Sequence, residues 1–322
     1  MRDDNQPRIV VLGGGTGLSM LLRGLKQYTE FLTAIVTVSD DGGSSGWLRR
    51  ELGMMPPGDI RRCLVALATT ENLMEQVIQH RFKQGEGLQG HTLGNLLLTA
   101  MTEITGDFMI AVTEVSKILA IRGRVLPAAL QMVTLGAQMS DGQVVFGETA
   151  IRAYPASISR IFLDPEEVVA PPEALQAIAE ADMIILGPGS LFTSLLPNLM
   201  VPVLKAAMVN ATCPRVYVCN IMTEHGETDG FTAAEHLRMI YQHIGQPCLD
   251  YAVVNNRVIT SEVAARYRSE EAYPVEYDCA EIEALGVKPI TADLLGEGVL
   301  AWHDSARLSQ VLLELLGSIK RG

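Results

Sequence analysis

The sequence contains few cysteines, and none of them are paired at metal-binding spacing. Its 322 residues include five cysteines, which are scattered along the chain without a C-x-x-C pair. An odd, dispersed set of this kind is typical of reduced thiols in a cytoplasmic protein. We therefore expect them to act as small apolar side chains, most of them buried.

The sequence also lacks long apolar runs and an excess of positive charge. No apolar run approaches the ~20 residues needed to cross a bilayer. The segment 1–7 has no apolar region typical of a signal peptide. The formal net charge is −12, which argues against nucleic acids and anionic membranes as partners but leaves room for a local anion pocket. We expect a cytoplasmic protein without membrane insertion.

What the sequence does contain is an alternation of short apolar runs with helical patterns. Residues 8–12 are typical of a strand, 16–28 of a helix and 32–38 of a second strand. This βαβ order predicts a parallel sheet with right-handed crossovers. Leucine and other apolar residues at helical spacing between 308 and 319 predict a C-terminal helix that packs on the core.

Between these regions the pattern changes. Helical patterns occur at about 58–70, 72–83, 91–105 and 107–121, and a hairpin is expected around Asp141-Gly142. We predict an α/β fold, Rossmann-like and doubly wound, with a mostly parallel sheet and an inserted helical and β-hairpin region. One domain over 1–322, with the helical section at about 58–125, is preferred over two domains divided near 150–170.

A glycine-rich turn directly follows the first expected strand. The residues are Gly13, Gly14, Gly15, Thr16 and Gly17. Such a strand–helix junction lets backbone N–H groups approach an anion at a helix N-terminus. No Lys-Ser/Thr follows, so it is not a Walker A loop, and Leu18 replaces the last glycine of G-x-G-x-x-G. The turn predicts phosphate or nucleotide binding and disfavours a dinucleotide oxidoreductase; a tight turn without a ligand is the alternative.

The segment 39–46, SDDGGSSG, ends the second expected strand without a single large apolar side chain. We expect a flexible loop that a ligand completes, with an ordinary surface turn as the alternative. Asp40 is suitably spaced to hold a ribose hydroxyl, and Asp41 could hold a divalent cation such as Mg²⁺ through water. The expected ligand contacts of this loop are Asp40, Asp41, Gly42, Gly43, Ser44 and Ser45.

Positive charge is concentrated just beyond this loop. Asp59 is expected to be the N-cap of a helix on which Arg61 flanks the apolar stripe and Arg62 lies nearly opposite it. Arginines near a glycine loop suit a phosphate or pyrophosphate. Solvated arginines paired with acidic residues are the alternative.

The helix expected at 91–105 carries a polar pair. Its apolar stripe would consist of Leu93, Leu96, Leu97, Ala100, Met101 and Ile104. His91 and Asn95 lie four residues apart on the other side. We expect them to face solvent or a cleft, with Gly94 leaving room for a ligand; an isolated surface histidine is the alternative.

Two later strands also end in polar turns. After the strand at 183–186 come Gly187, Pro188, Gly189 and Ser190, and then Thr193 and Ser194, which could bind phosphate or only cap the helix. Asn220 follows the strand at 215–219 as a ligand contact, whereas Glu224 and Glu227 are expected to be solvated. Because the carboxyl ends of parallel strands share one edge, these turns predict a single crevice.

The chain resembles the gluconeogenesis factor family in five strings: GGGTGLS, TAIVTVSDDGGSSGWLRRELGMMPPGDIRRCLVALA, LQGHTLGNLLLTA, LGPGSLFTSLLPNL and VCNIMTEHGET. That family is similar in fold to the 2-phospho-L-lactate transferases of deazaflavin coenzyme biosynthesis. The resemblance implies a cytoplasmic protein that binds a UDP-sugar such as UDP-N-acetylglucosamine. It also implies a link to gluconeogenic growth, cell shape and peptidoglycan supply. Tyr267, in a family-like segment, could stack on a uracil or sugar face.

Two functions follow as hypotheses. The first is a nucleotide-sugar-binding regulator, since the motifs contain no obvious nucleophile–base pair. The alternative is a group-transfer enzyme that uses Asp40 or Asp41 with Mg²⁺, and Arg61 or Arg62 to stabilise phosphoryl charge. The chain differs from the transferase branch at 57–62, 91–95 and 187–190, so nucleotide binding transfers more safely than phospholactyl transfer. A homo-oligomer is compatible with either hypothesis.

Overall fold

The computed structural model describes residues 6–69 and 72–321. Its main element is a seven-stranded sheet in the order β10-β9-β8-β7-β1-β2-β3, in which every neighbouring pair is parallel. The bounds are β1 (Ile9–Gly13), β2 (Leu32–Val36), β3 (Arg124–Pro127), β7 (Met183–Leu186), β8 (Arg215–Val218), β9 (Tyr251–Asn255) and β10 (Lys288–Ala292). The predicted α/β class is confirmed.

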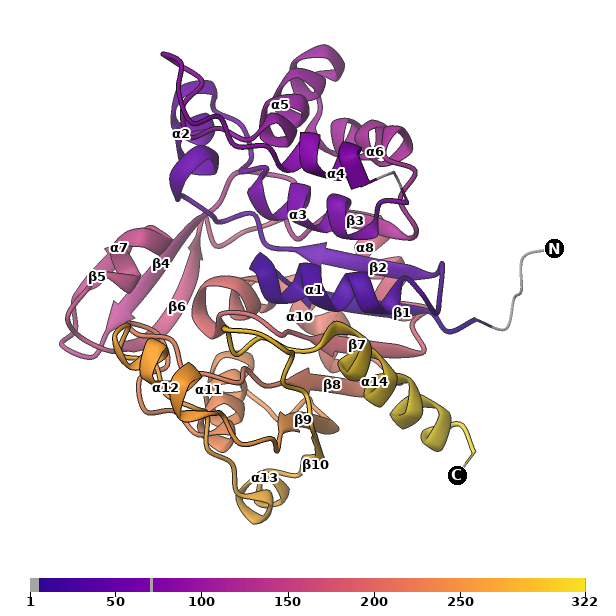
Figure 1. Cartoon of the computed structure of the whole chain (residues 1–322), viewed down its shortest axis with the longest axis vertical. Helices are drawn as coiled ribbons and strands as arrows, with labels where there is room; N and C mark the ends of the chain where they lie inside the picture. Colours follow the sequence, from indigo (N-terminus) through magenta and orange to yellow (C-terminus); the bar gives the residue numbers. More distant parts are fainter. Residues whose placement is uncertain (1–5, 70–71, 322) are drawn as a thin grey trace.

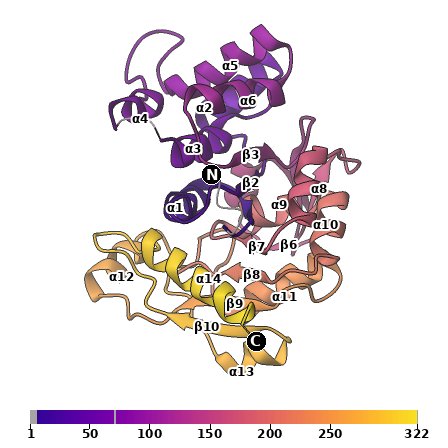
Figure 2. The same ribbon diagram turned by 90° about the vertical axis from the view of Figure 1, so that its right-hand side faces the viewer.

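Helices cover both faces of this sheet. Figure 2 shows α1 (Gly15–Leu25) and α14 (Ser305–Ile319) on one face, and α8 (Pro172–Ala179), α10 (Pro202–Val209) and α11 (Ala233–Ile244) on the other. Strands β1 and β2 are buried along their whole length. This explains why they are continuous apolar runs rather than alternating patterns, as parallel strands covered on both faces require.

The strand order reverses beside β1. From β1 the chain builds outward through β2 to β3, and it later returns to the other side of β1 with β7, followed by β8, β9 and β10. Leu12 pairs with Leu186, and the Gly187 N–H donates to the Leu12 carbonyl at 3.0 Å. In doubly wound sheets, a crevice at the carboxyl ends of the strands opens at such a switch point.

The inserted helical section lies beyond the β2–β3 edge of the sheet (Figure 1). It starts earlier than expected, because the SDDGGSSG stretch runs directly into a helix at Gly43. Its helices are α2 (Gly43–Leu52), α3 (Gly58–Leu67), α4 (Asn72–Gln79), α5 (Leu93–Thr105) and α6 (Phe108–Ile118).

A small antiparallel sheet forms the second inserted element. The hairpin expected around Asp141-Gly142 is confirmed as β4 (Thr134–Met139) and β5 (Val144–Phe146), and β6 (Ile158–Asp164) adds a third strand. A short helix, α7 (Glu148–Arg152), follows β5.

The remaining elements are a π-helical turn (Leu191–Leu195), α9 (Leu196–Leu199), α12 (Ser261–Arg268) and α13 (Cys279–Ala284).

All five cysteines are free thiols, and Cys63, Cys219 and Cys248 are buried. This agrees with the expectation that most serve as small apolar side chains. Within the described part of the chain no single helix is long and apolar enough to cross a membrane. Among the same residues, one pair of helices, Leu191–Leu199 and Pro202–Val209, is long and apolar enough when the two are taken together, but the pair is bent by 82°.

Candidate functional site at the switch point

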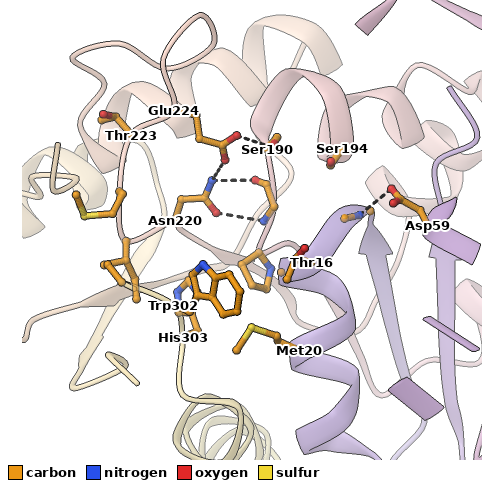
Figure 3. Close-up of a pocket in the computed structure, with 18 of the residues that line it drawn as sticks. Thr16, Met20, Asp59, Ser190, Ser194, Asn220, Thr223, Glu224, Trp302 and His303 are labelled. Carbon is orange, nitrogen blue, oxygen red and sulfur yellow. Dashed lines mark hydrogen bonds between the residues drawn. The ribbon is translucent and has the colours of Figure 1, made fainter. Parts of the chain in front are cut away.

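A cavity of about 450 Å³ opens where β1 and β7 end. Its walls come from the turn after β1, the turn after β7, the segment after β8 and a stretch just before α14, so residues from 14 to 303 meet there. The volume lies in the range of small-molecule sites in proteins. Figure 3 shows part of this wall.

The glycine turn after β1 is held against its neighbours so closely that side chains cannot fit. A Cβ at Gly14 would lie 2.7 Å from Asp59 Oδ2, and one at Gly17 would lie 2.7 Å from the Pro188 carbonyl oxygen. Gly15 adopts a φ of +68°, which glycine favours. Gly14, Gly15 and Gly17 are therefore required by the protein's own backbone and by the joint between the β1 and β7 turns.

Asp59 lies at this joint, and its expected role as N-cap is wrong. Pro57 is the N-cap of α3, and Asp59 lies in its first turn. Its carboxylate instead accepts the Gly15 N–H at the start of α1 at 2.7 Å, and it accepts Arg62 Nη1 at 2.6 Å. A carboxylate at a helix N-terminus is favourable, so one donor of the α1 terminus is already occupied within the protein.

The turn after β7 is fixed by two side chains from the segment after β8. Asn220 donates to the Gly189 carbonyl at 3.1 Å and accepts the Gly189 N–H at 3.2 Å. Glu224 accepts Asn220 Nδ2 at 2.9 Å and Ser190 Oγ at 2.5 Å (Figure 3). The expectation that Glu224 is simply solvated is therefore wrong, because this carboxylate orders the turn.

Glu227 was also expected in solvent, yet it is 4% exposed. It accepts the Phe192 N–H at 3.1 Å and Thr193 Oγ1 at 2.8 Å, and Arg152 Nε lies 3.5 Å away. Burial, followed by the charge of Glu224, raises the pKa of Glu227. The Thr193 hydroxyl is therefore used to bind Glu227, and Thr193 does not line the cavity.

Two hydroxyls at the cavity remain available to a ligand. Thr16 is exposed at the first turn of α1, and Ser194 is 7% exposed. Their backbone groups form hydrogen bonds: the Thr16 carbonyl accepts from Ser19 Oγ, the Ser194 carbonyl accepts from Asn198 Nδ2, and the Ser194 N–H donates to the Ser190 carbonyl. Both side-chain hydroxyls lie in the cavity wall and have no hydrogen-bond partner among residues 6–69 and 72–321 (Figure 3).

The cavity also gathers acidic groups. Burial, followed by the nearby charges of Asp40, Asp59 and Glu227, raises the pKa of Glu148 to about 9. Burial and the charge of Asp59 also raise the pKa of Asp40. Glu148 belongs to α7, and no motif around it in the sequence marks it as a site residue.

The SDDGGSSG stretch is not a flexible loop. Ser44 and Ser45 lie in the buried first turn of α2, and Ser45 Oγ accepts the Gly58 N–H at 3.1 Å. Asp41 does not line the cavity, and its Oδ1 accepts the N–H and hydroxyl of Thr149 at 3.1 and 2.9 Å. Small polar side chains fit here because helix termini and turns of the protein itself satisfy them.

His91 and Asn95 do not face solvent or a cleft, which corrects the sequence interpretation. They are 5% and 2% exposed. His91 Nδ1 lies 2.9 Å from Ser44 Oγ, Asn95 Nδ2 donates to the same oxygen at 3.0 Å, and Arg61 Nε donates to Asn95 Oδ1 at 2.9 Å. The space beside Gly94 is filled by Ile78 and Arg61.

An apolar end of the cavity went largely unpredicted. It consists of Met20, Ile221, Met222, Ala301 and Trp302, together with Tyr267, which was expected. Residues 301–303 follow an irregular segment, and no sequence motif there predicts a ligand contact.

The structure thus divides the predicted site residues into two sets. Those that line the cavity are Gly14, Gly15, Thr16, Gly17, Asp40, Asp59, Arg62, Pro188, Gly189, Ser190, Ser194, Asn220 and Tyr267. Those outside its wall are Gly13, Asp41, Gly42, Gly43, Ser44, Ser45, Arg61, His91, Asn95, Gly187 and Thr193. Gly42 lines an adjoining hollow that shares Asp40, Glu148 and Arg152 with the cavity.

Within residues 6–69 and 72–321, no group of three or more His, Cys, Asp or Glu side chains is arranged to hold a metal ion. Asp40 and Asp59 are the two carboxylates beside the glycine turn. Mg²⁺ in nucleotide sites is often held by one or two carboxylates plus phosphates. Two carboxylates are therefore the number expected for such a site. Both oxygens of Asp59 already accept hydrogen bonds, and Asp40 Oδ1 accepts the Gly42 N–H at 2.9 Å, so both carboxylates already have partners within the protein.

These features define a doubly wound α/β protein with a ligand-sized cavity at its switch point. The family model for 2-phospho-L-lactate transferase CofD matches residues 9–295. The chain is 50% identical over 312 residues to the gluconeogenesis factor of Bacillus subtilis (strain 168), covering 97% of this chain and 98% of that one. It is 49% identical over 307 residues to the gluconeogenesis factor of Halalkalibacterium halodurans, covering 95% of each.

A solved structure agrees with these matches. The crystal structure of protein BH3568 from Bacillus halodurans superposes with a TM-score of 0.93 at 48% identity, covering 96% of this chain and 100% of that one. The chain therefore belongs to the gluconeogenesis factor family, within the wider CofD family.

Proposed function

We propose that the protein is a cytoplasmic regulator that binds a nucleotide-sugar resembling UDP-N-acetylglucosamine. The observation that carries the proposal is the meeting of two glycine turns at the switch point, with the free hydroxyls of Thr16 and Ser194 between them. Backbone and hydroxyl donors at a helix start suit a diphosphate, and the apolar end beside Trp302 suits the rest of a nucleotide.

Regulation rather than catalysis is supported by the way the polar groups are used. Asn220, Glu224 and Glu227 are engaged in holding the turns. The Ser190 hydroxyl is paired with Glu224, but that carboxylate also accepts from Asn220 and so serves to order the turn after β7. In this proposal the ligand reports the supply of nucleotide-sugar during growth on gluconeogenic carbon sources. The names of the two bacterial gluconeogenesis factors support that link, and a role in cell shape and peptidoglycan supply would follow from such a ligand.

A second candidate is group transfer from a nucleotide-linked donor. Its support is the CofD family match and the pair of Asp40 and Glu148, two cavity carboxyls whose pKa values are raised by burial. Groups of this kind are suited to proton transfer near neutral pH. Of the two predicted arginines, Arg62 lines the cavity and is placed to meet phosphoryl charge, whereas Arg61 is buried against Asn95.

Titration calorimetry with UDP-N-acetylglucosamine tests the proposal. We expect the wild type to bind, and both Thr16→Val and Ser194→Ala to weaken binding by about tenfold each, because each loses a hydrogen bond to a charged group. Thr113→Val is the matched control, because Thr113 is exposed on α6 and remote from the cavity.

The ligand is then recovered and analysed. An intact nucleotide-sugar supports the regulator, whereas a cleaved or transferred one supports the second candidate. Absence of both heat and a thermal shift at millimolar ligand would refute nucleotide-sugar binding.

A further inference from the structure

Trp302 is a half-exposed aromatic side chain in the wall of the cavity. It is 48% exposed, and among the described residues no other aromatic ring packs against it. Figure 3 shows the indole beside Met20 and Thr16, at the start of α1. An indole left in water loses the stabilisation that burying its large apolar surface would provide, so its position calls for an occupant.

The backbone around Trp302 is anchored on both sides. The Ala301 N–H donates to Tyr267 Oη at 3.1 Å, and the Trp302 carbonyl accepts the Gly296 N–H at 2.8 Å. His303 Nε2 lies 3.1 Å from the Cys219 carbonyl, and burial lowers the pKa of His303 to about 4. The ring is therefore neutral at physiological pH, with Nε2 as the donor. The backbone that carries the indole is thus held in place before any ligand arrives, which reduces the entropy lost on binding.

The cavity is divided by polarity. The glycine turns, Ser194 and Arg62 line one part together with the carboxyl groups of Asp40 and Asp59, and Met20, Met222 and Trp302 line the other. A nucleoside diphosphate is divided in the same way, with charge at one end and a flat heterocycle at the other. Heterocyclic bases stack on aromatic side chains, and such contacts are tolerant of base identity.

We propose that Trp302 is the platform on which the base of the nucleotide stacks, and that it thereby sets the orientation of the ligand. The base lies against the indole beside Met20, and the diphosphate points to the glycine turns and the hydroxyls of Thr16 and Ser194. This inference rests on the proposed function and adds the residue that recognises the base and not the sugar.

The experiment uses the two tryptophans of the chain as reporters. Trp47 lies on α2, edge-on to His91 at 4.8 Å between ring centroids, and does not line the cavity. Trp47→Phe leaves Trp302 as the only emitter, and Trp302→Phe leaves only Trp47. We expect UDP and UDP-N-acetylglucosamine to quench the fluorescence of Trp47→Phe strongly and to leave that of Trp302→Phe unchanged.

Calorimetry on the wild type, Trp302→Ala and Trp302→Phe measures their affinity for UDP and for the sugar phosphate. We expect the Trp302→Ala variant to bind UDP about tenfold more weakly than the wild type, or weaker still. The same variant should bind N-acetylglucosamine 1-phosphate with the wild-type affinity. Trp302→Phe retains a ring and should bind UDP within a few-fold of the wild type. Equal melting temperatures of the three proteins establish that a loss of affinity comes from stacking and not from misfolding.

The outcomes separate this inference from the function on which it rests. UDP binding to wild type and Trp302→Ala with equal affinity would overturn the base platform and leave nucleotide binding intact. Equal quenching of Trp47→Phe by the sugar phosphate would place the sugar at Trp302 and also overturn it. Failure of every nucleotide to bind would remove both proposals.

Discussion

At the scale of single residues, the site is governed by where carboxyl groups lie. Asp59 occupies the start of α1 and is paired with Arg62, so it is a stabilising internal anion. Glu148 is different, because its neighbours Asp40, Asp59 and Glu227 are all acidic and Arg152 only partly offsets them. A carboxyl group in that setting binds a proton more tightly when the protein is folded than when it is unfolded.

This difference predicts a pH dependence of stability. The pKa of Glu148 is about 9 in the folded protein against 4.5 ordinarily. Between these values the folded state holds a proton that the unfolded state has lost, so the free energy of unfolding falls as pH rises from 5 to 9. Glu148→Gln cannot ionise, so we expect it to lose much of this slope and to be more stable than the wild type at pH 8, by about 1 kcal/mol or more. Urea unfolding at several pH values measures it.

The control for this series is Glu173→Gln, which alters an exposed glutamate on α8. It should follow the wild-type profile. Some slope is expected to remain in Glu148→Gln, because the pKa of Asp40 is raised in the same direction. A wild-type profile for Glu148→Gln would mean that Glu148 ionises normally and that the cavity is better solvated than its burial implies.

The sequence allowed some of these residues to be predicted and not others, for a physical reason. Thr16 and Ser190 lie next to glycines at strand ends, where short-range pattern determines position. Glu148 and Trp302 reach the same cavity from segments whose local sequence is unremarkable. Their placement depends on how the small antiparallel sheet and the segment before α14 pack, which is a long-range property.

At the scale of elements, α5 shows how periodicity can indicate the wrong buried face. The fully buried side carries Gly94, Asn95, Leu98 and Thr99. Of the predicted apolar stripe, Leu96, Leu97 and Met101 are only partly buried against the core, and Ile104 is 80% exposed. Polar groups can line a packed face when they satisfy one another, as Asn95 does with Ser44 and Arg61. Hydrophobic spacing alone cannot reveal such a partnered network, so the helix was predicted correctly and its orientation was not.

This network predicts an unusual pair of mutational effects on one helix. Asn95→Ala leaves the buried Arg61 Nε without its acceptor, so we expect the free energy of unfolding to fall by about 2–4 kcal/mol. Ile104→Ala removes an exposed side chain and should change it by less than about 0.5 kcal/mol. Chemical denaturation of both variants measures the difference. The reverse order would show that the apolar stripe, and not the polar face, is what α5 buries.

At the scale of the whole molecule, the strand order joins the two halves of the chain. β7 pairs with β1 along Ile9 to Leu12, and β1 is flanked by β2 on its other side. α14 packs on α1 so closely that a Cβ on Gly24 would lie 2.3 Å from the Ser305 carbonyl oxygen. A division near 150–170 would therefore separate strands that are neighbours in the sheet and leave α1 without its C-terminal cover.

This arrangement predicts that the chain unfolds as one cooperative unit. We expect a single calorimetric transition whose calorimetric and van't Hoff enthalpies agree. We also expect fragments 1–165 and 166–322 to be unfolded when expressed alone, because each would expose one edge of the β1–β7 joint. Since the cavity walls span residues 14 to 303, UDP-N-acetylglucosamine should raise the midpoint temperature of that one transition. At a ligand concentration a hundredfold above Kd, the free energy of unfolding should rise by about 2.7 kcal/mol. Two separable transitions, with ligand moving only one, would instead favour two domains and place the binding energy in one of them.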